Sequence, residues 1–195
     1  MHATPMPLRR AVVVSMLPAV MLAGCAGAPK DSSASSSSTS TSQSDAEPIT
    51  ITNCGQKVTL NKPATRAVTL NQGATEDVLA IGGESKLAGT AYLDSEIPEK
   101  WKKAYNSVKV LSKKYPPKET FLSAKPDLAV SSYSSAFTDK AVGTREELKK
   151  QGIATYISPF ECPKGTPSAE ATWENVWKEM AEVGTPVSYT HLTLP

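Results

Sequence analysis

Short strand-like and helix-like segments alternate between residues 49 and 184, and this alternation constrains the fold more than any other feature. Two runs with a two-residue apolar–polar period flank an Asn-Cys-Gly-Gln turn, which predicts a β-hairpin over residues 49–60. Strand and helix patterns then alternate, with strands expected at 67–70, 87–91, 128–131 and 153–157 and helices at 75–81, 99–105, 119–124 and 144–151. Such an alternation predicts an α/β lobe: a parallel sheet with helices on both faces, preceded by the hairpin.

A longer helix is expected to begin after Thr172. Apolar side chains recur there at spacings of three and four, and they are Trp173, Val176, Trp177, Met180 and Val183. An apolar stripe of this kind usually packs in a protein core, so we expect its aromatic rings to be buried.

Ligands of parallel α/β sheets bind beyond the carboxyl ends of the strands. In this chain the residues at those positions carry hydroxyl, amide and aromatic groups, which suit a large, partly apolar ligand with polar edges. The predicted ligand face consists of Asn71, Gln72, Tyr92, Tyr133, Ser134 and Phe160. The alternative for each Tyr is a half-buried packing role, because the ring has an apolar body and a polar tip.

The first 24 residues have the pattern of an export signal. Arg9 and Arg10 precede an apolar run, residues 11–22, that is too short to cross a membrane. The run ends in Leu-Ala-Gly-Cys, which resembles a bacterial lipobox and implies cleavage before Cys25 and lipidation of its thiol. The alternative is an ordinary secretory signal with a chance Cys. Both place the mature protein outside the cytoplasm, and lipidation would anchor it to the cell membrane.

The sequence predicts three further regions around the lobe of residues 48–171. Residues 25–47 are rich in Ser and Thr and should form a tether, because they cannot bury apolar surface. Residues 172–186 begin the long helix. Residues 187–195 break its pattern and read like a translated sequencing adapter, so we expect them to be non-native and not to pack on the lobe. A natural apolar tail is the alternative.

Charge and histidine content exclude several functions. The chain has 21 Lys and Arg and 19 Asp and Glu, and without Arg9 and Arg10 the two counts are equal, which disfavours nucleic acid as a partner. Its two histidines, His2 and His191, lie outside residues 48–186. A Ser-His-Asp triad and the usual His ligands of zinc and haem are therefore missing. We predict no catalytic residue, no metal site and no cofactor.

Cysteine content predicts one cross-link. If Cys25 is lipidated, Cys54 and Cys162 remain. Two cysteines in an exported domain favour a disulfide, and two separately buried thiols are the alternative.

Residues 119–128, Glu-Thr-Phe-Leu-Ser-Ala-Lys-Pro-Asp-Leu, resemble a signature of class III substrate-binding proteins. These are the ferric-siderophore, haem and vitamin B12 receptors of ABC importers. Residues 66–76 are similar to the first strand and helix of that family, and residues 172–184 resemble the start of its inter-lobe helix. The resemblance covers about residues 58–184 and implies a Rossmann-like N-terminal lobe, with the family's second lobe absent from this sequence.

The resemblance implies a lipid-anchored, monomeric receptor on the extracytoplasmic side of the membrane, without enzymatic activity. Such a receptor captures an iron complex, here expected to be a ferric siderophore, and delivers it to an ABC permease. Glu119 matches the acid that docks on a permease arginine, although an acid at a helix start can also serve the helix alone. The alternatives are a cobalamin or haem receptor of the same family and a surface lipoprotein with no role in transport.

Overall fold

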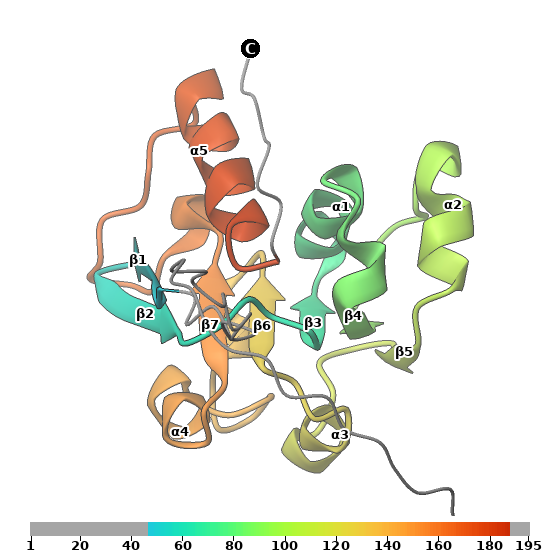
Figure 1. The fold of residues 1–195 in the computed structure, drawn as a ribbon, viewed down its shortest axis with the longest axis horizontal. Helices are drawn as coiled ribbons and strands as arrows, with labels where there is room; N and C mark the ends of the chain where they lie inside the picture. Colours follow the sequence, from blue (N-terminus) through green and yellow to red (C-terminus); the bar gives the residue numbers. More distant parts are fainter. Residues whose placement is uncertain (1–46, 188–195) are drawn as a thin grey trace, which may run out of the picture. The chain divides into compact units, whose positions relative to one another are not determined.

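The computed structural model describes residues 47–187. A sheet of five parallel strands, in the order β5-β4-β3-β6-β7, lies beside a separate antiparallel hairpin of β1 and β2 (Figure 1). The strands are β1 (Ile49–Asn53), β2 (Gln56–Leu60), β3 (Ala67–Leu70), β4 (Leu87–Ala91), β5 (Val110–Ser112), β6 (Leu128–Ser131) and β7 (Ala154–Ile157). The helices are α1 (Gln72–Ala80), α2 (Glu99–Asn106), α3 (Lys118–Ser123), α4 (Arg145–Lys150) and α5 (Trp173–Gly184), with 3-10 turns η1 (Gly83–Lys86), η2 (Ser134–Ala136) and η3 (Pro159–Glu161). The predicted fold class is confirmed.

Most helices and strands begin and end close to the predicted residues, because local sequence features set these ends. The capping box of α4 is present: the Thr144 hydroxyl accepts a bond from Glu147 N, and the Glu147 carboxylate accepts one from Thr144 N. The strand β5 was not predicted, because three residues are too short to show a period. The helix α1 begins three residues earlier than predicted, directly after Asn71.

The core has two parts, one on each face of the sheet. One part joins the hairpin, α1 and the end of α5 to the sheet and includes Val58, Val78, Val130 and Val183. The other joins α3 and α4 to the opposite face, where Phe121 and Leu148 are buried. Helices therefore cover both faces, as a parallel sheet requires.

A disulfide joins Cys54, in the hairpin turn, to Cys162, directly after η3. The two Cα atoms are 5.3 Å apart, within the usual range for a bridge. The bridge spans 108 positions of the sequence and ties the hairpin to the end of the sheet.

Side chains, rather than a strand, close the outer edge of β7. The amide nitrogen of Asn53 donates to Ile157 O at 2.7 Å, and its amide oxygen accepts from Ile157 N at 2.9 Å. Arg145 Nη2 donates to Thr155 O at 3.1 Å and to the Asn53 side chain at 3.1 Å. The hairpin is thereby fastened to the sheet at a position where a further strand would otherwise pair.

The buried-stripe prediction for α5 is wrong for its two Trp. Trp173 is 79% exposed and Trp177 is 40% exposed, whereas the buried residues of α5 are Glu179, Val183 and Gly184. The burial pattern shows the cause: the C-terminal half of α5 packs on the lobe, whereas residues 47–187 leave most of its first turns exposed. An apolar stripe shows which face of a helix can be buried. Burial also requires another element that packs against that face.

The expectation that residues 187–195 do not pack is wrong at Val187. This residue is fully buried in the same cluster as Val58 and Val183, and the preceding Pro186 O accepts a hydrogen bond from Ala64 N at 2.6 Å. Residues 188–195 lie outside the described range, as do the predicted signal, Cys25 and most of the tether. Within residues 47–187, no helix combines the length and the apolar character that a membrane span needs.

Candidate functional site

The predicted ligand face comes from the carboxyl ends of four strands. Asn71 follows β3, Tyr92 follows β4, Tyr133 and Ser134 follow β6, and Phe160 lies in η3 after β7. Hydrogen bonds and a ring contact bring the β3, β4 and β6 ends together. Phe160 is further along the sheet, and within residues 47–187 no hydrogen bond or ring contact joins it to the other five.

Asn71 lies at the centre of this face, but its side chain is buried. Its side chain is 1% exposed, and its backbone has a φ of 83°, which only a few residue types adopt readily. The amide oxygen accepts hydrogen bonds from Ser131 Oγ at 2.9 Å and from Tyr115 OH at 3.1 Å. Asn71 therefore joins β3, β6 and the loop after β5, and it positions neighbours more than it offers groups to a ligand.

Tyr92 and Tyr115 form an aromatic pair on the same face. Their ring centres are 4.7 Å apart, with an edge-to-face angle of 75°. Tyr92 has a φ of 56°, an unusual value for a bulky side chain, and such strain at a strand end is typical of functional sites. Tyr115 also bonds Ser135 Oγ at 3.0 Å. Sequence analysis missed Tyr115, because it follows β5, the strand that was not predicted.

Tyr133 presents the most accessible ring of the predicted set. It is 42% exposed, and its backbone N–H is held by Ser131 Oγ at 3.2 Å. Gln72 is occupied differently: its side-chain amide donates to Glu96 O, accepts from Ser95 N and also bonds Glu76. Gln72 therefore supports the loop beyond β4, while the Tyr133 ring is exposed.

The start of α1 fits closely against this face. A Cβ on Gly73 would lie 2.8 Å from Ser132 Oγ, the same atom that accepts a bond from Ala74 N at 2.8 Å. A larger residue at Gly73 would displace Ser132, which precedes Tyr133. The close approach of α1 and the β6 end thus requires a glycine.

The Lys-Pro-Asp signature has a structural role. The Asp127 carboxylate accepts bonds from Thr65 N at 2.7 Å, Thr65 Oγ1 at 2.9 Å and Arg66 N at 3.0 Å. Arg66 in turn donates from its guanidinium to Ala124 O and Lys125 O. These hydrogen bonds connect the start of β6 to the start of β3. The signature that carries the resemblance therefore holds two strands together at the amino edge of the sheet.

Glu119 lies exposed in the first turn of α3. Its neighbour Lys118 forms an ion pair with Glu147 at 3.2 Å, whereas no hydrogen bond or ion pair of the Glu119 side chain is found within residues 47–187. A carboxylate in this position is available to a partner, as the docking hypothesis requires.

A cluster of acids lies where α1 meets α5. Burial, followed by the charges of Glu179 and Glu76, raises the pKa of Asp77 to about 7. Burial also raises the pKa of Glu179. Tyr156 OH donates to Glu182 Oε2 at 2.9 Å, and burial raises the pKa of Tyr156 as well. Within residues 47–187 no set of three His, Cys, Asp or Glu side chains is arranged to hold a metal ion.

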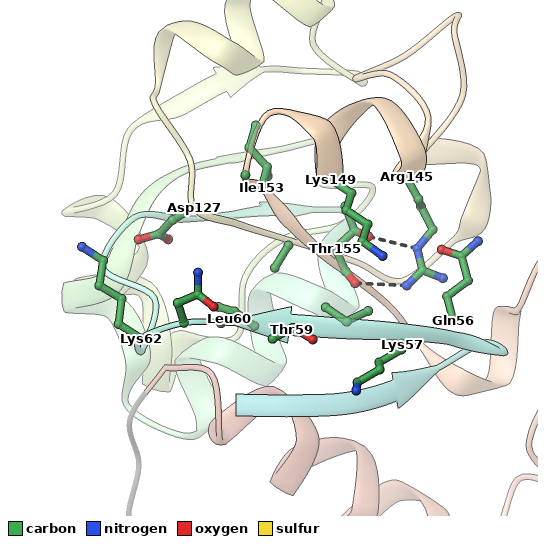
Figure 2. Close-up of a pocket in the computed structure, with 14 residues that line it drawn as sticks. Gln56, Lys57, Thr59, Leu60, Lys62, Asp127, Arg145, Lys149, Ile153 and Thr155 are labelled. Atoms are coloured by element: carbon green, nitrogen blue, oxygen red, sulfur yellow. Dashed lines mark hydrogen bonds between the residues drawn. The ribbon is translucent and has the colours of Figure 1, made fainter. Parts of the chain in front are cut away.

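A cavity of about 380 Å³ lies away from the predicted face, between β2 and the amino end of β7 (Figure 2). Arg145 and Lys149 reach it from α4, and residues of β2, including Lys57, line its other side. Sequence analysis did not find this cavity, since its residues come from distant segments that share no motif.

Several solved structures are similar to this chain. A periplasmic binding protein from Veillonella parvula has 29% sequence identity and a TM-score of 0.60, over 71% of this chain and 45% of that protein. An ABC-type Fe3+-hydroxamate transport system from Saccharomonospora viridis has 24% identity and a TM-score of 0.56, over 72% and 48%. The periplasmic catecholate-siderophore binding protein from Vibrio cholerae has 23% identity and a TM-score of 0.51, over 71% and 44%.

These similarities confirm the expected resemblance at the level of fold. The first includes sequence as well as fold, and the other two show the fold alone. The chain spans less than half the length of each of the three proteins. No protein-family model matches the sequence, and no curated protein matches it.

Proposed function

We propose, from the fold that this chain shares with part of the periplasmic binding proteins, that it forms one lobe of the substrate-binding component of an ABC importer. The observation that carries the proposal is the similarity to the Veillonella parvula protein in both sequence and fold. Two proteins of the same fold serve Fe3+-hydroxamate transport and catecholate-siderophore binding, which supports a ferric chelate as the ligand. The lobe acts by binding, not by catalysis.

The ligand face is proposed to be the carboxyl edge of the sheet. Tyr133 offers an exposed ring, and the Tyr92 ring is held in place by its edge-to-face contact with Tyr115. Flat, aromatic or conjugated parts of a chelate would stack on these rings, and Ser134 would bond a polar edge. Asn71 and Gln72 hold the surrounding loops. The remaining contacts would come from the second lobe of a two-lobed protein.

Attachment and docking complete the proposal. A lipid on Cys25 would hold the protein at the outer side of the cell membrane, with residues 25–47 as a tether. Glu119 would meet an arginine of the permease in a paired hydrogen bond. Its exposure at the start of α3 supports this role.

Calorimetric titration of the chain tests the ligand. Ferric desferrioxamine B and ferric enterobactin represent hydroxamate and catecholate chelates, and haemin and cyanocobalamin represent the alternative receptors. Tyr133→Ala should weaken binding of the preferred chelate about tenfold, because a stacking ring contributes about 1–1.5 kcal/mol. Tyr105→Ala, on α2, is the matched control and should leave affinity unchanged.

Three results would count against the proposal. Binding of haemin or cyanocobalamin alone would replace the iron chelate by the alternative ligand. Equal losses in the Tyr133 and Tyr105 variants would remove Tyr133 from the ligand face. Binding of none of the four compounds at millimolar concentration would favour a lipoprotein with no role in transport.

A further inference from the structure

Arg145 carries a buried positive charge that has no carboxylate partner. It is 7% exposed, and its hydrogen bonds go to neutral oxygens: Thr155 Oγ1 at 2.9 Å, Thr155 O, Asn53 O and Asn53 Oδ1. Burial lowers the pKa of the guanidinium to about 10, so it remains charged at neutral pH. Buried charges in proteins are usually paired, and an unpaired one favours a nearby anion.

This guanidinium lines the cavity between β2 and β7 together with further cations. Lys57, Lys62 and Lys149 also line it, and none of the three forms an ion pair within residues 47–187. Figure 2 shows Lys149 and Arg145 extending from α4 toward Thr155 on β7. Four cationic residues therefore line the cavity, and Arg145 and Lys149 extend toward the same strand.

The cavity has one carboxylate, so its cationic residues are in excess. That carboxylate, Asp127, accepts three hydrogen bonds from Thr65 and Arg66. The remaining wall includes apolar residues, among them Leu60 and Ala154. A volume of about 380 Å³ lies within the range of ligand pockets, about 300–1,000 Å³.

We propose that this cavity binds a small amphiphilic anion, with a phosphate or carboxylate head at Arg145 and Lys149 and a short apolar body along Ala154. The head would supply the negative charge that Arg145 lacks, and the apolar wall would exclude a fully hydrated inorganic ion. The site lies at the amino ends of β6 and β7, so it is separate from the proposed chelate face and does not depend on the proposed function.

Octyl phosphate is the probe, and octyl glucoside is its neutral counterpart with the same chain length. Titration of the 15N-labelled full chain with octyl phosphate should shift the backbone amide signals of Gly152, Thr155 and Lys57. Octyl glucoside should leave these signals unchanged at the same concentration. The signals of Tyr92 and Tyr133 should not move, because those residues lie at the other edge of the sheet.

Lys149→Glu tests the charge without removing the buried Arg145, whose loss could unfold the lobe. It should weaken octyl phosphate binding about tenfold, since it replaces an attraction by a repulsion at the site. Lys150→Glu is the matched control: it changes the net charge equally on the next residue of α4 but does not line the cavity. Equal affinities of the two variants would overturn the proposal, as would shifts confined to Tyr92 and Tyr133 or equally strong binding of octyl glucoside.

Discussion

Asp77→Asn should stabilise this protein at neutral pH and have little effect in acid. Asp77 belongs to α1 and lies near the acids of α5, with Glu179 and Glu76 contributing to its environment. Tyr156 and Glu182 complete the group of titratable side chains at this interface. Burial is the largest cause of the raised pKa of Asp77, and the neighbouring negative charges add to it.

The magnitude follows from the two pKa values. A rise from 3.8 to about 7 corresponds to about 4 kcal/mol of free energy that favours the protonated form in the folded state. Between these values the folded state binds more protons than the unfolded state, so stability falls as the pH rises. Below about pH 4 both states are protonated, and the penalty vanishes. Because Asp77 is only partly shielded from solvent, we expect the Asn variant to gain about 2–4 kcal/mol at pH 8.

Urea unfolding followed by far-ultraviolet circular dichroism measures this gain. The wild type and Asp77→Asn should differ at pH 8 and become similar at pH 4. Asp139→Asn is the control, because this exposed aspartate lies in the loop before α4. If the free energies of unfolding of the wild type and Asp77→Asn agree within about 0.5 kcal/mol at both pH values, the reasoning is refuted. The buried charge of Asp77 would then not destabilise the fold.

Four further expectations follow from the fold and the site. Cys162→Ser should cost about 2–5 kcal/mol in urea unfolding, because it removes the long-range link to Cys54; an unchanged midpoint would contradict this. Asp127→Ala should cost about 1–3 kcal/mol by the same measurement, since three donors lose their acceptor, and full stability would show that water replaces it. Trp173→Ser should change stability by less than about 0.5 kcal/mol, because the ring is exposed, and a larger loss would show that it packs. Glu119→Gln should leave chelate affinity intact and reduce uptake by cells, whereas full uptake at normal protein levels would exclude it from docking.

The parts of the fold that depend on local pattern could be predicted from the sequence. The strands β4 and β6 have the predicted bounds, because short apolar runs between turn residues define them. The capping box at Thr144 is equally local. By contrast, β5 is too short to show a period, and Tyr115 was missed with it.

Features that depend on a neighbour could not be predicted in this way. The spacing of apolar residues identified α5 as a helix, but burial of Trp173 needs an opposing surface that residues 47–187 do not supply. The cavity beside Arg145 likewise combines residues of β2 and of α4, which lie far apart in the sequence. The sequence predicted which polar and aromatic residues follow the strands. Only the structure shows that Asn71 is buried and holds its neighbours in place, whereas Tyr133 is exposed.

The side-chain closure of β7 has a consequence for self-association. A bare outer strand of a parallel sheet can pair with the same strand of another molecule and start aggregation. Here the Asn53 amide takes both hydrogen-bonding groups of Ile157, and Arg145 takes the carbonyl of Thr155. Asn53 is adjacent to Cys54, so reduction of the disulfide would loosen the residue that protects this edge. A reducing environment should therefore promote aggregation of this protein through β7 even while its core remains folded.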